Sequence, residues 1–138
     1  MREILFRGKR KSDGKWIESS STLKSGEEIY FANINTQILC YGNSNVINSM
    51  EGTSTKPIFY RIRNKTVGQY TGLNDKNGNK IFEGDIVKHD NKIYVIKYLE
   101  KYARFAPTNS HSVFMVCAFE QLEIIGNIHD NPELLKGE

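Results

Sequence analysis

The fold is decided by residues 67–99, which read VGQYTGLNDKNGNKIFEGDIVKHDNKIYVIKYL. Short apolar and β-branched segments alternate there with clusters of Gly, Asp and Asn, a pattern typical of β-strands joined by tight turns. The Asp-Lys-Asn-Gly sequence at residues 75–78 predicts a type I turn that Gly78 closes in a left-handed conformation. Sharp turns are also expected at residues 83–85 and 90–91. These turns separate four predicted strands, at residues 67–73, 80–82, 86–89 and 93–99.

The residues that follow continue this pattern. After a loop around Pro107, two more strands are expected at residues 113–119 and 122–128. Apolar residues at helical spacing within 95–102 are outweighed by the β-branched and aromatic content, so we expect a strand that ends near residue 99. Short strands in this number and spacing predict a small antiparallel barrel or sandwich. At the end, Asn131 as cap and Pro132 as first helical residue predict one short helical turn.

The first half has weaker patterns. A hairpin is expected from a strand at residues 4–9, an Asp-Gly turn at residues 12–15 and a return strand from residue 16. Two further stretches favour strands, one or two within residues 27–41 and one at residues 58–62. The intervening segments are interpreted as a polar connector at residues 19–26 and a long loop at residues 42–56.

The class predicted is therefore mainly β (β-rich α+β). We divide the chain into an N-terminal β-rich subdomain with a long loop, residues 1–66, and a C-terminal barrel subdomain with a helical turn, residues 67–138.

Composition sets limits on location and partners. The 138 residues include 38% hydrophobic residues and carry a formal net charge of +3, a mild excess that permits an acidic partner without requiring one. No stretch approaches the roughly 20 apolar residues of a membrane span. The N-terminus also lacks the apolar run of about 7–15 residues found in secretory signals. We therefore expect a cytoplasmic protein, with no membrane partner, whose Cys40 and Cys117 are separate thiols.

The central stretch also carries a family resemblance. Residues 69–87, QYTGLNDKNGNKIFEGDIV, resemble the signature of the YopX protein family, small proteins encoded mainly by bacteriophages and prophages. The start, residues 2–7, and the end, residues 124–135, are similar to the same family in the same order. One departure is Gly68, where the family more often has Met, and residues 19–66 match only loosely.

The resemblance implies a phage or prophage origin in a bacterial host cell, an SH3-like barrel in the C-terminal part, and self-assembly into a homo-oligomer. The resemblance supplies no activity, because the family has no established one, and a likeness of fold supplies no function either. We predict no cofactor.

Several spacings suggest chemistry but are better explained as turns. Asp75, Asn77 and Asn79 match the first positions of a calcium loop, but Lys80 stands where that loop requires Gly. The carboxylate-x-lysine spacings at residues 13–15 and 90–92, found in some metal-dependent nucleases, coincide with tight turns.

Two further combinations of residues resemble catalytic groups. Glu83 and Asp85 flank a Gly, and Asp85 is expected to hydrogen-bond the turn backbone instead of doing acid–base work. Cys40 or Cys117 could pair with one of the histidines as nucleophile and base, but no oxyanion-hole motif supports this. The three histidines, His89, His111 and His129, are scattered and form no set of metal ligands. We therefore predict no catalytic and no metal-binding residue.

The main surface signal is basic. Two clusters are candidate nucleic-acid-binding residues, namely Arg7, Lys9, Arg10 and Lys11 in the first and Arg61, Arg63 and Lys65 in the second. Small barrels bind nucleic acid with cations beside aromatic platforms, and the aromatic candidates are Tyr94, Tyr98 and Tyr102. The competing interpretation is an ordinary solvated face whose lysines protect sheet edges.

The sequence thus predicts a non-enzymatic binding or assembly module whose partners are copies of itself or a host or phage protein. A nucleic-acid-binding protein that uses the two basic clusters is the first alternative. A small phage hydrolase or nuclease is the second, and no residue pattern points to it.

Overall fold

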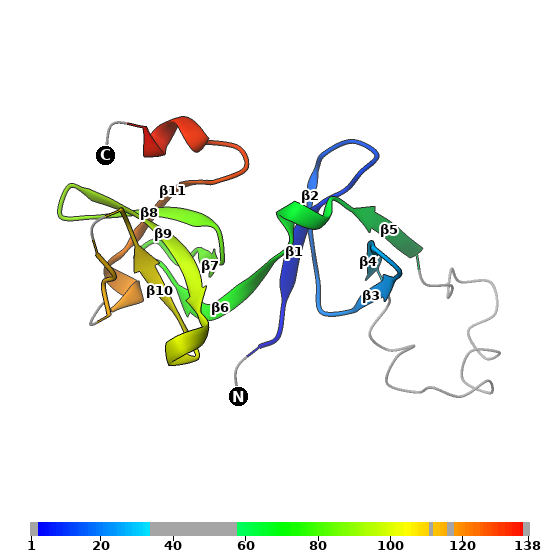
Figure 1. Ribbon diagram of the computed structural model, residues 1–138, viewed down its shortest axis with the longest axis horizontal. Helices are drawn as coiled ribbons and strands as arrows, with labels where there is room; N and C mark the ends of the chain where they lie inside the picture. Colours follow the sequence, from blue (N-terminus) through cyan, green and yellow to red (C-terminus); the bar gives the residue numbers. More distant parts are fainter. Residues whose placement is uncertain (1–2, 34–57, 111, 116–117, 137–138) are drawn as a thin grey trace. The chain divides into compact units, whose positions relative to one another are not determined.

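The structure is a computed structural model that describes residues 3–33, 58–110, 112–115 and 118–136. It confirms the mainly β class, because the regular elements of the described residues are short strands and single 3-10 turns (Figure 1). The chain forms two compact units, residues 7–67 and residues 1–6 with 68–138. We call them the N-terminal unit and the C-terminal unit. Within the described residues, no helix is long and apolar enough to cross a membrane.

The division of the chain differs from a simple cut between residues 66 and 67, because residues 1–6 belong to the C-terminal unit. The backbone N–H of Tyr70 donates to the carbonyl of Leu5 at 2.8 Å, and both side chains are buried together with Phe82. Leu5 therefore packs beside Tyr70 and Phe82, although it lies far from both in the sequence.

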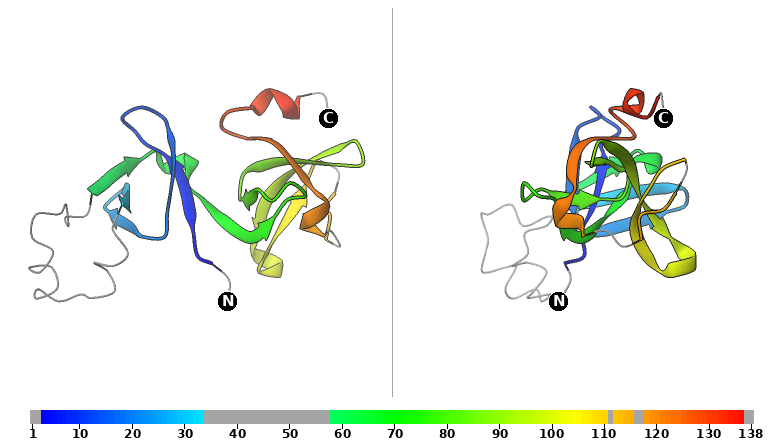
Figure 2. Two further views of the ribbon diagram at one scale, coloured as in Figure 1. Left: turned by 180° about the vertical axis from the view of Figure 1, so that it is seen from behind. Right: turned by 90° about the vertical axis from the view of Figure 1, so that its left-hand side faces the viewer.

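The C-terminal unit is built from six strands. They are β6 (Gly68–Asn74), β7 (Lys80–Phe82), β8 (Asp85–His89), β9 (Lys92–Leu99), β10 (Arg104–Thr108) and β11 (Glu123–Asn127). Four of them form an antiparallel sheet in the order β10-β9-β8-β11, whose curved strands are visible in Figures 1 and 2. Its core consists of Ile81, Val87, Tyr94, Ile96, Phe105, Phe119 and Leu122. Whether this arrangement is SH3-like in detail stays a prediction.

The turns in the central stretch are confirmed. Gly78 has φ +83° and its N–H donates to the carbonyl of Asp75 at 3.0 Å, as expected for a type I turn closed by a left-handed residue. Asp90 and Asn91 join β8 to β9 with φ 49° and 64°. These two residue types adopt the left-handed region more readily than most, so a two-residue hairpin turn forms without glycine.

Asp75 ties this turn to a distant strand. Its carboxylate is buried and accepts the N–H groups of Asn77 and Asn79 at 2.9 Å each, and that of Ile124 on β11 at 3.1 Å. Burial by itself would raise the pKa of Asp75, but these three donors outweigh it and the pKa is lowered. The calcium-like spacing is therefore a structural turn, and the described residues contain no group of three potential metal ligands.

Two predictions about the C-terminal half are wrong. The expected loop around Pro107 is strand β10, which pairs with β9 and places Pro107 opposite Ile96. Proline is tolerated there because β10 lies at the edge of its sheet, where a missing N–H does not interrupt a ladder. Among the described residues of the expected strand at 113–119, pairing is limited to one bridge between Val113 and Thr108, and a 3-10 turn, η3 (Phe119–Gln121), occupies its end. Residues 116–117 lie outside the described residues.

Close backbone approaches explain two glycines. A Cβ on Gly68 would lie 2.6 Å from the carbonyl oxygen of Glu83, so residue 68 cannot hold a side chain on this backbone. A Cβ on Gly126 would lie 2.6 Å from Oδ1 of Asn131. Asn131 precedes the expected helical turn, η4 (Pro132–Leu135), but its side chain accepts the N–H of Asn127 at 3.3 Å and does not cap η4.

The N-terminal unit contains five short strands and one 3-10 turn. They are β1 (Phe6–Lys9), β2 (Trp16–Ser19), β3 (Thr22–Ser25), β4 (Glu28–Asn33), β5 (Ile58–Ile62) and η1 (Asn64–Thr66). Strands β3, β4 and β5 form a sheet in that order. Phe31 and Ile62 lie fully buried on one face of it, beside Gly8, where a Cβ would be 2.5 Å from Ile62.

The polar connector expected at residues 19–26 is also wrong, because it contains β3. All four residues of β3 are exposed, so the strand lacks the apolar alternation by which strands are recognised in a sequence. Its pairing with β4 supplies the order instead. The long loop expected at residues 42–56 and both cysteines lie outside the described residues.

Replacing Asp75 by Asn should destabilise the protein by about 1–3 kcal/mol, because three backbone N–H donors then lose their buried, charged acceptor. Urea unfolding of the purified variant measures this change. Asp90→Asn is the matched control, since the Asp90 side chain is 87% exposed and Asn also fits a left-handed turn. The control should remain within about 0.5 kcal/mol of the parent. Equal stabilities of the two variants would contradict the role of Asp75.

The contribution of Asp75 should also depend on pH. Its folded-state pKa lies below the usual value of 3.8, so the stabilisation is complete above that value and is lost as the pH falls through the lowered pKa. Unfolding free energies of the parent and Asp75→Asn, measured from neutral to strongly acidic pH, should therefore converge at the acid end. A gap that stays constant at every pH would show that the carboxylate charge is not responsible.

Candidate functional site

All seven predicted basic residues lie in the N-terminal unit, and the structure joins their two clusters. The N–H of Lys11 donates to the carbonyl of Arg61 at 2.8 Å, and the N–H of Arg63 donates to the carbonyl of Lys9 at 2.8 Å. An antiparallel bridge between Arg10 and Ile62 lies between these bonds. The end of β1 and the end of β5 therefore form one short ladder. It brings part of each predicted cluster together in what we call the basic surface, namely Lys9, Arg10 and Lys11 with Arg61 and Arg63. Lys65 lies beyond this ladder, in the 3-10 turn η1.

Carboxylates accompany this surface. Glu28 on β4 binds two of its cations, Lys11 and Arg61, each at 2.9 Å. Arg10 is paired with Asp13 in the β1–β2 turn, where Asp13 also accepts the N–H of Lys15 at 3.0 Å. Hydrogen bonds from Lys11 and then Arg61 lower the pKa of Glu28. Ion pairs this exposed add little to folding stability, so their partners remain available for a competing anion.

Aromatic rings lie beside the same cations. The guanidinium of Arg10 lies 5.2 Å from the centre of the Tyr60 ring. Arg7 and Lys9 lie over Trp16 on β2, at 4.8 Å and 5.4 Å from the ring centre. Such contacts hold the cations at fixed positions near the surface.

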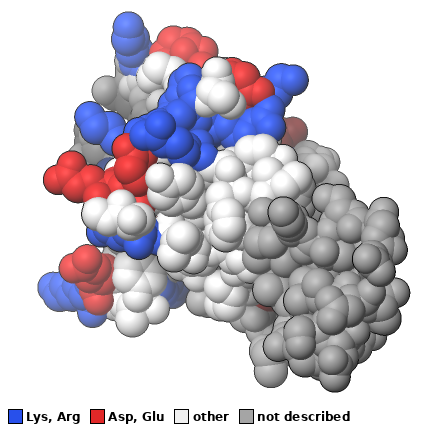
Figure 3. Space-filling view, turned by 90° about the vertical axis from the view of Figure 1, so that its right-hand side faces the viewer, with Lys and Arg blue, Asp and Glu red and all other residues white. Residues whose placement is uncertain are grey.

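A hollow of about 430 Å³ opens on this surface. It is lined by Arg10, Lys11, Ser12, Phe59, Tyr60 and Arg61. Phe59 and Arg61 project from the same face of β5, because side chains alternate along a strand, and Phe59 is 49% exposed. Figure 3 looks toward this side of the chain and shows Lys and Arg gathered at the upper edge, interleaved with Asp and Glu, beside an uncharged area.

The charge of the chain is unevenly divided. Residues 7–67 contain ten Lys and Arg against five Asp and Glu, a net charge of +5. The C-terminal unit contains nine against eleven, a net charge of −2. The overall +3 therefore conceals a strongly basic unit. A count of charges for each predicted subdomain would have revealed this from the sequence.

The tyrosines proposed as aromatic platforms belong to the C-terminal unit and are not equivalent. Tyr94 is buried in the core with its ring 5.6 Å from that of Phe114, so it cannot stack on a ligand. Tyr98 and Tyr102 are about half exposed, and Tyr98 packs edge-on against Phe105 at 5.1 Å. The sequence pattern did not identify Phe59 and Tyr60 as candidate binding residues, although both adjoin the second cluster, because it indicated only a strand at residues 58–62.

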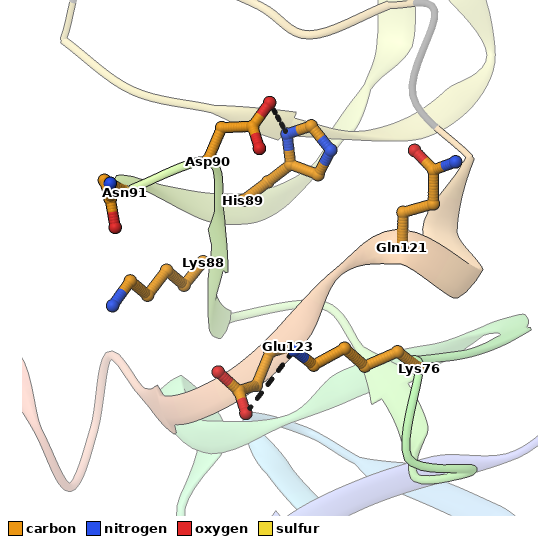
Figure 4. Close-up of a pocket in the computed structure, with 7 residues that line it drawn as sticks. All are labelled: Lys76, Lys88, His89, Asp90, Asn91, Gln121 and Glu123. Carbon is orange, nitrogen blue, oxygen red and sulfur yellow. Dashed lines mark ion pairs between the residues drawn. The ribbon is translucent and has the colours of Figure 1, made fainter.

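A second, polar hollow of about 720 Å³ lies on the C-terminal unit. It is lined by Lys76, Lys88, His89, Asp90, Asn91, Gln121 and Glu123. Figure 4 shows two pairs across it, Lys76 with Glu123 at 3.9 Å and His89 with Asp90 at 3.6 Å, while Lys88 and Asn91 point away from both. Its two lysines and two carboxylates balance, so this hollow carries no net charge to attract an ionic ligand.

One of the residues considered as catalytic groups, Asp85, has a structural role. Asp85 is 2% exposed and accepts the N–H of Phe82 at 2.8 Å, which confirms its predicted function in the turn. The two cysteines and His111 lie outside the described residues.

Comparison with known proteins agrees with this architecture. A model of the YopX protein family matches residues 5–136. No curated protein matches the sequence significantly. The crystal structure of protein EF1440 from Enterococcus faecalis is similar, with a TM-score of 0.57 and 22% sequence identity, over 99% of this chain and 100% of that chain. At this identity the likeness shows the fold alone.

Proposed function

The chain belongs to the YopX protein family, and we propose that it is a non-enzymatic binding module whose N-terminal unit binds nucleic acid. The observation that carries the proposal is the hollow in which Lys11 and Arg61 adjoin an exposed aromatic ring, Phe59. Cations beside aromatic side chains are the combination with which proteins hold nucleic-acid backbones and bases. A phage or prophage origin, which the family resemblance implies, and a cytoplasmic location, which we expect from the sequence pattern, belong to the same proposal.

Electrostatics support this ligand. The N-terminal unit carries +5, and clustered positive charge raises the local concentration of polyanions and speeds their association. Lys11 and Arg61 are exposed and pair with the surface carboxylate of Glu28, so phosphate can replace that carboxylate at small cost.

The hydrogen bonds of the buried carboxylates are also consistent with a binding role. Asp75 and Asp85 direct their carboxylates at backbone N–H groups. Groups held in this way stabilise turns and are poorly placed to exchange protons with a substrate.

Binding should weaken steeply with salt. If three cations of the basic surface contact phosphates, raising the salt from about 50 to 200 mM should weaken binding of a single-stranded oligonucleotide by roughly 20-fold. Fluorescence anisotropy with a labelled DNA or RNA oligomer measures this. Reversing Arg61 and Arg63 together to Glu should abolish the binding, since two cations become anions.

The matched control is the double reversal of Lys92 and Lys97, which changes the net charge equally in the C-terminal unit, where both residues are exposed. This variant should retain most of the affinity. Absence of binding by the parent at the lower salt would refute the proposal, and equal losses in both variants would show that only net charge matters.

Self-assembly is a second candidate function, favoured by strand β3. It lies at the edge of the β3-β4-β5 sheet, all four of its residues are exposed, and Leu23 is 51% exposed. Exposed edges can pair with a strand of another chain.

The expected result is an oligomer that Leu23→Lys weakens, because a charge at the edge opposes pairing. Light scattering across micromolar concentrations measures the mass. Leu73→Lys is the control, since Leu73 is similarly exposed, at 49%, in the C-terminal unit. A parent protein that is monomeric throughout would exclude assembly.

A further inference from the structure

We propose that the basic surface selects single-stranded over duplex nucleic acid, with Phe59 as the platform for an unpaired base and Glu28 as an internal competitor for the phosphate site. The inference depends on the proposed function, because it names the form of nucleic acid bound and the groups that discriminate. It is carried by three observations: the exposure of Phe59, the shared carboxylate partner of Lys11 and Arg61, and the hollow between them.

Phe59 is exposed although it is large and apolar. Neighbouring side chains on a strand point to opposite faces, so one of Ile58 and Phe59 would ordinarily be buried, yet both are 49% exposed. The Phe59 ring borders the hollow and can be covered by a flat apolar partner. A base in a duplex has both faces stacked on other bases, whereas an unpaired base has a free face for an aromatic side chain.

The phosphate site is marked by Glu28. Its carboxylate is bound at once by Lys11 and Arg61, each at 2.9 Å, from a strand that neither cation occupies. Two cations that converge on one carboxylate can converge on one phosphate, whose oxygens accept the same charge-assisted hydrogen bonds. Glu28 therefore stands where we place the phosphate, and an incoming strand must displace it.

The spacing between the two subsites suits one nucleotide. Phe59 and Arg61 are two residues apart on the same face of β5, which separates their Cα atoms by about 7 Å. A base on the ring and its own backbone phosphate at Arg61 can therefore be bound together. The site reads no base identity, because stacking is tolerant of sequence.

The test uses the full chain and three probes. These are a fluorescein-labelled oligothymidine, the same strand annealed to oligoadenine, and an abasic strand of equal length. Anisotropy at low salt gives each affinity. The parent should bind oligothymidine at least tenfold more tightly than the abasic strand or the duplex, because only oligothymidine offers a stackable base together with its phosphate.

Variants at Phe59 test the platform. Phe59→Ala should weaken oligothymidine binding about tenfold and leave the abasic strand unchanged, because only the stacked base is lost. Phe59→Trp should restore the affinity, since indole stacks as well. Circular dichroism and thermal unfolding establish that each variant is folded. Equal weakening of both strands by Phe59→Ala would overturn the stacking role.

Variants at Glu28 test the competitor. Glu28→Gln should tighten oligothymidine binding several-fold, because Lys11 and Arg61 lose their internal anion. Glu27→Gln is the matched control, since it makes the same change of net charge one residue away and no ion pair of Glu27 occurs among the described residues. Equal effects of the two variants would overturn the competitor role.

The outcomes separate this inference from the proposed function. Duplex bound as tightly as single strand, with both lost in the Arg61 and Arg63 reversal, would leave nucleic-acid binding in place and overturn the selectivity. No binding of any probe would overturn the proposed function itself.

Discussion

The backbone of residues 9–11 is hydrogen-bonded to that of residues 61–63, and the character of the N-terminal unit depends on this pairing. It brings together two runs of cations that lie far apart in the sequence. It also sets the basic surface beside β4, so that Glu28 can reach both Lys11 and Arg61. Without this ladder, the chain would carry two separate basic stretches and no hollow.

The two units use charged groups differently. In the C-terminal unit, carboxylates such as Asp75 and Asp85 are buried and accept backbone N–H groups, so their charges hold turns in place. In the N-terminal unit, the carboxylates of Asp13 and Glu28 lie at the surface and pair with cations. Another anion, such as a phosphate, can bind these cations in their place. Stability is thus concentrated where charges are desolvated and fully bonded, and ligand binding is proposed where they are exposed.

Local sequence patterns predicted those structural features that depend on residues close together in the sequence. The turn at residues 75–78, the strand β5 and the role of Asp85 follow from turn chemistry and side-chain alternation, and all are confirmed. The hydrogen bond from the N–H of Ile124 to the carboxylate of Asp75 joins residues 49 positions apart, so no local sequence pattern predicts it. Strand β3 was not predicted because it is ordered by pairing with β4 and not by burial. Strand β10 was not predicted because it contains Pro107, which is tolerated at the edge of a sheet. The basic residues were also predicted from the sequence, but the backbone pairing that brings the two clusters together was not.

The most direct test of the account is a titration of the isotope-labelled chain with a single-stranded oligonucleotide, followed by two-dimensional ¹H–¹⁵N NMR. The account predicts shifts in residues 9–12 and 59–63, with Glu28 perturbed as its cations change partner, while the resonances of β8 and β9 stay in place. Shifts confined to the C-terminal unit, or an unchanged spectrum at low salt, would contradict the assignment of the binding surface to the N-terminal unit.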